Sequence, residues 1–104
     1  MRVGTPLRFR GLECAEVLGT AVPVATTVPS RLLGLALLRR ERAGPGLLIP
    51  RCRSVHTFGM RFPLDVLFLD EHDRVIELRR SVPPCRVIRC PGAMAVLELS
   101  SPQA

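Results

Sequence analysis

Apolar residues follow strand-like patterns along most of the chain, most clearly in the segment FPLDVLFLD at residues 62–70. In a strand, alternate side chains point to opposite faces, so Leu64, Val66 and Phe68 share one face. The other face is apolar except at Asp65. Because both faces are suited to burial, we expect this segment to be an inner strand of a sheet.

The same reasoning predicts further short strands on both sides of that segment. The polar run at residues 70–73 predicts a turn, and the apolar pattern at residues 74–78 predicts a hairpin with the preceding strand. Residues 17–28 are rich in Val and Thr and predict a strand or a strand pair. Additional strands are expected at residues 47–49, 85–89 and 93–99, separated by Pro- and Gly-containing turns.

One segment has helical character instead. Ser30 is a good N-cap, straight-chain residues follow it, and Arg39 and Arg40 suit the last turn. Gly34 weakens this helix by about 1 kcal/mol relative to Ala. The sequence therefore predicts a mainly β domain, a small sandwich or barrel of short, mostly antiparallel strands with one short α-helix at about residues 30–40.

The length of 104 residues fits a single domain over residues 1–104, with a polar tail at residues 100–104 that we expect to be frayed. No apolar run reaches the ~18 residues of a membrane-spanning helix. Near the N-terminus, Glu13 and Glu16 interrupt the apolar stretch that a secretory signal requires. The sequence alone therefore predicts a cytoplasmic location.

The net charge is +6, and all 15 basic residues are Arg. This bias is typical of a GC-rich genome and does not by itself indicate a binding function. Proteins that bind single-stranded nucleic acids add aromatic platforms to basic surfaces, whereas this chain has only four Phe and neither Trp nor Tyr. Nucleic-acid binding is therefore not favoured. A polyanion-binding protein that uses the Arg clusters remains an alternative, and it requires those residues to form one continuous stripe.

The four cysteines leave three interpretations open. Cys14 lies apart, and no Cys-x-x-Cys pair is present to suggest thioredoxin-like chemistry. The first interpretation is that the cysteines are small buried hydrophobes, without a cofactor. The second is a Cys52–Cys90 disulfide in an oxidising compartment. The third is structural zinc, held by the ligand set Cys52, His56, Cys85 and Cys90.

Asp65 is the first candidate for chemistry, because a carboxylate within an apolar strand needs a partner. The partner is expected to be Arg61 or Arg51, the His56 ring, or backbone N–H groups of a tight loop. A His56–Asp65 pair would have the components of a general base. No catalytic nucleophile accompanies it, so we assign no catalytic residues. The candidate ligand-binding residues are His56, Thr57, Met60, Arg61, Asp65 and Glu98.

Four segments in order resemble the bacterial and archaeal family known as domain of unknown function 192. They are Arg31–Leu35, Gly44–Ile49, Pro63–Asp70 and Val96–Leu99, and the family-like core spans about residues 20–99. The Pro-Leu-Asp block at residues 63–65 is the most specific. Many members carry a Trp-Met-x-Asn-Thr motif before it, where this chain has His56-Thr57-Phe58-Gly59-Met60, which indicates a short subgroup.

The resemblance implies a compact β-rich fold and no established activity. Many members are exported, so the resemblance leaves open an extracytoplasmic location and an association with the cell envelope. We expect a non-enzymatic module that binds an unknown small ligand or protein, with its oligomeric state undetermined. The alternative is a hydrolase-like enzyme that uses His56 and Asp65.

Overall fold

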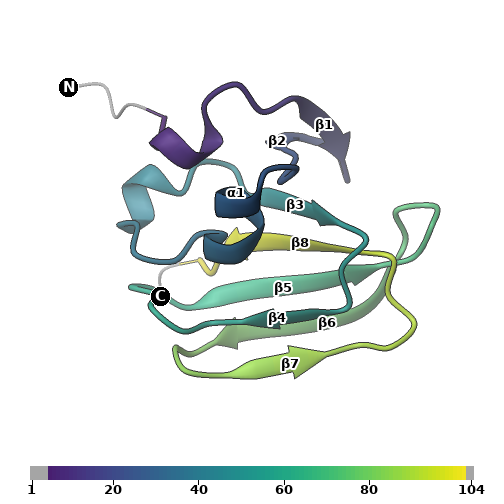
Figure 1. The fold of residues 1–104 in the computed structure, drawn as a ribbon. Helices are drawn as coiled ribbons and strands as arrows, with labels where there is room; N and C mark the ends of the chain where they lie inside the picture. The colour runs from purple at the N-terminus through teal and green to yellow at the C-terminus, as the bar shows by residue number, and fades with distance from the viewer. Residues whose placement is uncertain (1–4, 103–104) are drawn as a thin grey trace.

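The computed structural model describes residues 5–102, whose strands form three small sheets (Figure 1). The largest sheet has the order β3-β8-β5-β6. Two further sheets are formed by the pairs β1-β2 and β4-β7. The strands are β1 (Cys14–Val17), β2 (Thr20–Pro23), β3 (Leu47–Pro50), β4 (Ser54–His56), β5 (Leu64–Leu69), β6 (Val75–Val82), β7 (Val87–Arg89) and β8 (Ala95–Ser100).

All strand pairs in these sheets are antiparallel, which confirms the predicted mainly β fold. The sheets formed by residues 5–102 do not close into a barrel. The strand predicted to be an inner one, β5, lies between β8 and β6. Its predicted hairpin with β6 is present, although β6 continues to Val82.

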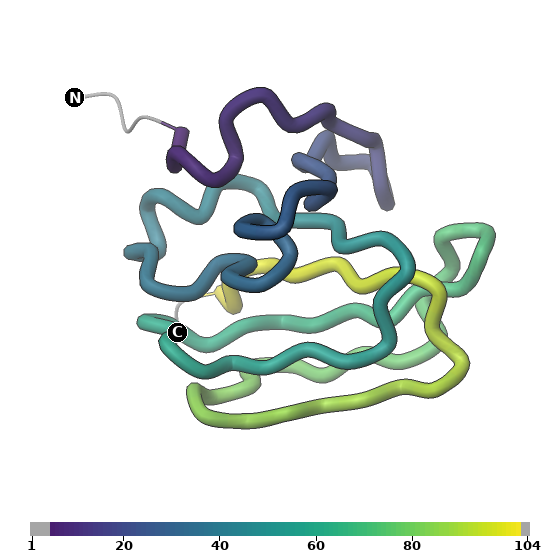
Figure 2. The backbone as a smooth tube through the Cα atoms, viewed as in Figure 1, coloured from purple at the N-terminus to yellow at the C-terminus, as the bar shows by residue number. Residues whose placement is uncertain are grey.

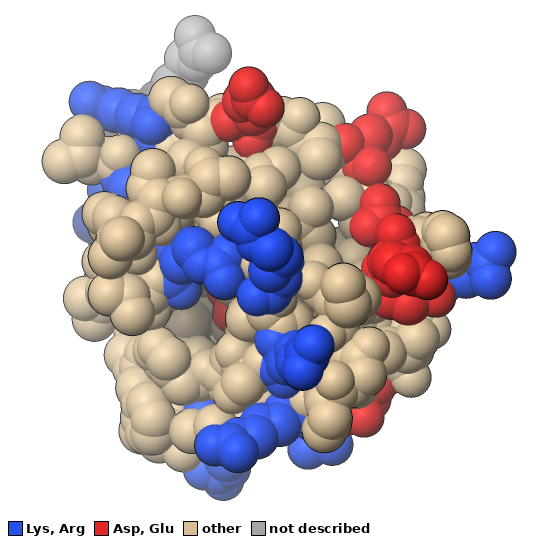
Figure 3. Space-filling view, turned by 45° about the vertical axis from the view of Figure 1, so that its right-hand side comes forward, with Lys and Arg blue, Asp and Glu red and all other residues tan. Residues whose placement is uncertain are grey.

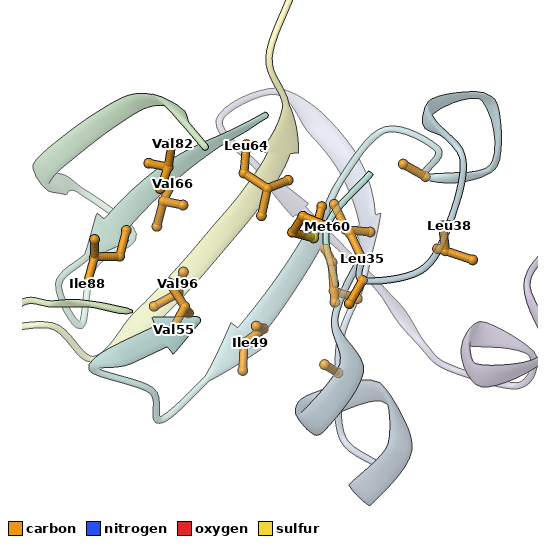
Figure 4. Close-up of a cluster of buried hydrophobic side chains, with 14 of the residues drawn as sticks. Leu35, Leu38, Ile49, Val55, Met60, Leu64, Val66, Val82, Ile88 and Val96 are labelled. Carbon is orange, nitrogen blue, oxygen red and sulfur yellow. The ribbon is translucent and has the colours of Figure 1, made fainter. Parts of the chain in front are cut away.

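The main core lies between the four-stranded sheet and the β4-β7 pair. Val66, Phe68 and Val96 are completely buried on the inner face of the large sheet, and Val55 of β4 and Ile88 of β7 pack into the same cluster (Figure 4). Burying side chains of this size is favourable by about 1.5–3 kcal/mol each. This layer positions β4 in front of the large sheet, as Figure 1 shows.

The β1-β2 hairpin covers part of the opposite face of the large sheet. Val17 and Val22 of the hairpin pack in a second cluster with Leu48 of β3 and Leu97 of β8. In register, Leu48 pairs with Leu97, Leu97 with Leu67, and Leu67 with Leu78, so one row of leucines crosses the entire sheet. The hairpin covers this row at β3 and β8, whereas Leu78 on β6 is 43% exposed.

The predicted helix at residues 30–40 is shorter than expected. Helix α1 spans Val28–Leu33, and its N-cap is Thr27, not Ser30. The Thr27 and Ser30 side chains form a capping box, which satisfies N–H groups of the first turn. The helix ends because Gly34 takes φ 51° and ψ −125°, a conformation outside the helical region.

Residues 5–102 also form two short 3-10 helices, η1 (Leu7–Phe9) and η2 (Arg40–Arg42). After α1 the chain runs beside the end of β8 (Figure 2). Within residues 5–102, no helix is long and apolar enough to cross a membrane.

The prediction of a frayed tail at residues 100–104 is wrong for residues 100 and 101. Ser100 belongs to β8, and Ser101 is only 2% exposed. The Ser101 hydroxyl donates to Asp65, and its carbonyl accepts a hydrogen bond from Arg40. Because the side chains at residues 100 and 101 are polar, they were expected to be exposed to solvent, but both residues are ordered at the end of the sheet. Residues 103 and 104 of the predicted tail lie outside the described residues.

Candidate functional site

Glu98 is a carboxylate on the buried face of the large sheet. The register places it between Leu47 of β3 and Val66 of β5, both of which are completely buried. The residue itself is 3% exposed. Because alternate positions of this strand enter the core, the side chain at residue 98 points into the protein interior.

The Glu98 carboxyl group is only partly satisfied. The backbone N–H of Leu35 donates a hydrogen bond to it. Its Oε1 atom is buried without any hydrogen-bond partner. This oxygen faces the turn after α1, because a Cβ atom built on Gly34 would lie 2.7 Å from it. Unsatisfied buried polar atoms are rare in folded proteins and cost about 1–3 kcal/mol.

Burial also changes the protonation of this group. Desolvation raises the pKa of Glu98 to about 7, against the opposing effect of the Leu35 N–H bond. Perturbed carboxyl groups of this kind are concentrated at functional sites, although structural carboxyl groups are perturbed as well. At neutral pH the group is therefore divided between a neutral acid, which can donate a hydrogen bond, and a carboxylate, which accepts only.

Glu98 lines a small cavity between α1, β3 and β4. The cavity has a volume of about 50 Å³, room for a few water molecules or for one polar head group. Its polar lining comes from Arg31, Cys52, Ser54, His56 and Glu98. The apolar part of the lining consists of Leu32, Leu33, Ile49 and Val55.

His56 is held at this cavity by hydrogen bonds to both ring nitrogens. Its Nδ1 atom accepts from the Phe58 N–H at 3.2 Å, and Nε2 lies 3.2 Å from the Leu32 carbonyl oxygen. These partners assign the neutral tautomer with its proton on Nε2. The ring also stacks on Phe58, with centroids 5.5 Å apart. The imidazole therefore joins β4 to α1 and is not directed at Asp65.

Arg31 places a positive charge beside the cavity. Its guanidinium donates to the Pro50 carbonyl at 2.7 Å and to the Arg51 carbonyl at 3.3 Å. Among residues 5–102 it has no carboxylate partner. Arg51 and Arg53 flank Cys52, and Arg89 pairs in register with Ser54. On the face drawn in Figure 3, basic side chains gather over the middle and lower parts, while acidic side chains lie mostly at the right-hand side.

Three other predicted site residues lie away from this cavity. Thr57 is completely buried, and its hydroxyl donates to the Pro83 carbonyl at 2.7 Å and accepts from the Arg86 N–H at 2.8 Å. It therefore fixes the connection between β6 and β7. Met60 belongs to the main core, and Arg61 is exposed.

Asp65 has structural partners. One of its carboxylate oxygens accepts from the Ser81 backbone N–H at 2.9 Å and from the Ser101 hydroxyl at 2.6 Å. Of the partners expected from the sequence, a backbone N–H group is present, although it belongs to strand β6 and not to a tight loop. Among the described residues, Arg61, Arg51 and His56 make no hydrogen bond to Asp65. The structure does not bring His56 and Asp65 together.

Replacement of Asp65 by Ala should therefore destabilise the fold. The buried Ser101 hydroxyl and the Ser81 N–H lose their common acceptor, which is expected to lower the free energy of unfolding by about 1–3 kcal/mol. Urea denaturation measures this change. The control is Glu71→Ala, which removes an exposed carboxylate and should cost less than about 0.5 kcal/mol. Equal stabilities of the two variants would contradict the structural role of Asp65.

The cysteines of the described chain are free thiols. Cys14 and Cys85 are exposed, and Cys52 and Cys90 are half-buried against the main core. The Cys52 thiol donates to the Ser54 carbonyl at 3.2 Å. Among residues 5–102, no three His, Cys, Asp or Glu side chains form a group that could hold a metal ion, so Cys52, His56, Cys85 and Cys90 do not assemble.

The sequence over most of the chain identifies its family. Residues 13–104 match the profile of DUF192, described as "Uncharacterized ACR". The chain belongs to DUF192. No curated protein matches it. Membership confirms the resemblance noted from the sequence and, because the family is uncharacterised, assigns no activity to Glu98 or to its cavity.

A solved structure shows that the fold recurs in another uncharacterised protein. It is a crystal structure of a protein of unknown function from Novosphingobium aromaticivorans, similar with a TM-score of 0.57 and 19% sequence identity. The similarity covers 95% of this chain and 89% of the other. At this identity the likeness supports the DUF192 fold alone.

Sequence reasoning named Glu98 and His56 but missed the residues that join them into one site. From the sequence, Arg31 belongs to the predicted helix, a family-like segment and an Arg cluster. Cys52 is a buried hydrophobe, a disulfide partner or a zinc ligand, and neither residue is predicted to lie near Glu98. Gly34 gave a signal as the weak point of the predicted helix. Nothing in the local sequence indicates that its backbone approaches Glu98, which is 64 positions later in the chain.

Proposed function

We propose that this DUF192 protein is a non-enzymatic binding module that takes an oxyanionic group of a small ligand, a carboxylate or a phosphate, into the Glu98 cavity. The observation that carries this proposal is the buried Oε1 atom of Glu98, which has no hydrogen-bond partner although the Glu98 side chain lines the cavity. In the acid form, this oxygen offers a hydrogen-bond donor that a ligand oxygen satisfies.

The charges around the cavity favour an anion over a cation. Arg31 lines the cavity, and Arg51 and Arg53 are the chain neighbours of Cys52, which also lines it. An ammonium group would meet this positive potential, whereas a carboxylate or phosphate is attracted to it. The small volume admits only a head group, so the remainder of the ligand lies outside, next to the exposed side chain of Leu32.

Binding of acetate and of inorganic phosphate, the two probes, should follow the protonation of Glu98. At about pH 5.5 the acid form is present, and at about pH 8.5 it falls to a few per cent, so the apparent affinity should drop roughly tenfold or more. Chemical-shift titration of the amide groups of Gly34, Leu35 and His56 measures the affinity. Comparison of the two probes distinguishes a carboxylate site from a phosphate site.

Two variants of Glu98 separate this site from unspecific attraction by Arg. The amide of Glu98→Gln keeps a donor at every pH, so this variant should bind acetate, which is ionised at both pH values, with little change between them. Glu98→Leu removes the donor and should not bind at either pH. Wild-type and Glu98→Leu titrations that coincide would refute the proposal.

The other functions considered from the sequence receive different support. His56 and Asp65 have separate partners, so a hydrolase based on that pair is not favoured. The gathered Arg side chains of Figure 3 support polyanion binding as a second candidate. It predicts heparin affinity that falls steeply with salt and is unchanged in Glu98→Leu. Association with the cell envelope stays a prediction from the family.

A further inference from the structure

Strand β6 forms one edge of the four-stranded sheet, and its outer edge pairs with no other strand of residues 5–102. It spans eight residues, of which Glu77–Arg79 pair with β5 in unbroken register between two register shifts. Its exposed apolar side chains include Ile76 at 45% and Leu78 at 43% exposure. Unpaired N–H and C=O groups along a long edge are a template for pairing with another strand. Leu78 is also the open end of the leucine row that crosses the sheet.

We infer that β6 pairs antiparallel with β6 of a second copy of this chain, about a two-fold axis at Leu78, to give a continuous eight-stranded sheet. The partner is a second copy because the strand is complementary to itself. This interaction is independent of the function proposed for the Glu98 cavity.

The allowed registers follow from antiparallel geometry. In an antiparallel pair, two directly opposite residues are either hydrogen-bonded to each other or both direct their N–H and C=O groups to the other side. The two kinds of pair alternate along the strand. A symmetric pair therefore requires the axis to pass through a residue and not between two residues. An axis at Glu77 would oppose two Glu77 side chains, and an axis at Arg79 would oppose two Arg79 side chains. Like charges directly opposite are destabilising.

An axis at Leu78 avoids both conflicts. It opposes Leu78 to Leu78 and places Glu77 of each copy opposite Arg79 of the other, which forms two ion pairs across the interface. Within one chain, Glu77 and Arg79 already lie on the same face, 3.2 Å apart, and both are accessible. The leucine row then continues from one sheet into the next, so apolar surface at Leu78 is removed from water on both copies.

The test is sedimentation equilibrium of the full chain from about 1 µM to about 1 mM, the range over which weak interfaces dissociate. The wild type is expected to form dimers. Glu77→Arg and Arg79→Glu should each raise the dimer dissociation constant at least roughly tenfold, because each places like charges opposite one another. The control is Glu71→Arg, the same change of charge in the turn before β6, which should dimerise as the wild type does.

Mixing provides a result that a folding defect cannot produce. When Glu77→Arg chains are mixed with Arg79→Glu chains, the arginine introduced in the first chain faces the glutamate introduced in the second. The unchanged Arg79 of the first chain likewise faces the unchanged Glu77 of the second, so heterodimers should form although each variant pairs only weakly with itself. The double variant Glu77→Arg/Arg79→Glu should dimerise again. A wild type that is monomeric throughout, or a mixture that does not associate, would overturn the inference.

Discussion

Glu98→Gln should stabilise the protein at alkaline pH by about 3 kcal/mol. The wild-type carboxyl group has a folded pKa of about 7, against an ordinary value of 4.5. Between these values the folded state binds more protons than the unfolded state, so wild-type stability falls as pH rises from about 4.5 through 7. Each unit of pKa difference corresponds to 1.36 kcal/mol, and the loss is complete above the folded pKa.

The glutamine variant removes this loss because its amide does not ionise. Its oxygen accepts the Leu35 N–H bond, and no charge is buried above pH 7. Urea denaturation of both proteins at several pH values should give curves that coincide below about pH 4.5 and separate progressively above it. The control is Glu71→Gln, the same chemical change at an exposed carboxylate, whose curve should parallel the wild type. A constant difference between Glu98→Gln and wild type would show that Glu98 does not titrate abnormally.

The pattern of apolar residues predicted the strands of the large sheet well, but it predicted the β4-β7 pair and the helix poorly. The pattern in residues 62–70 predicted an inner strand, and β5 is one. The prediction succeeded because a strand that is buried on both faces has apolar residues at almost every position. The pair β4-β7 has three residues in each strand, which is too short for a period-2 pattern to identify β4. Leucines after Gly34 fitted a helical period, yet Leu35 and Leu38 reach the core from a non-helical turn.

The sequence predicted individual residues of the candidate site but not how they are arranged in space. A carboxylate in an apolar strand requires a partner, and this argument left Asp65 a choice of an Arg, the His56 ring or backbone N–H groups of a tight loop. The partners are the Ser81 N–H of strand β6 and the Ser101 hydroxyl. The same argument identified Glu98, but in the structure one of its oxygens has no partner. The cavity depends on the approach of α1, β3, β4 and β8, which are distant in sequence. No local pattern encodes that approach.

Gly34→Ala should cost about 2–4 kcal/mol, because two independent effects coincide at this position. With φ 51° and ψ −125°, the backbone occupies a region that side-chain-bearing residues reach only with about 1–3 kcal/mol of strain. The new Cβ would also lie 2.7 Å from Oε1 of Glu98, so the buried carboxyl group must shift to relieve the contact.

A cycle of variants separates the two effects of this substitution. Gly44→Ala serves as the control, since Gly44 has φ 70° but nothing lies within 4 Å of its added Cβ, so only about 1 kcal/mol of strain is expected. In a Glu98→Ala background the carboxyl group is absent, and Gly34→Ala should cost at least about 1 kcal/mol less than in the wild type. Denaturation of the four chains in the Gly34 and Glu98 cycle measures this coupling. Additive costs would mean that the Gly34 backbone does not approach Oε1 of Glu98 as closely as the structure shows.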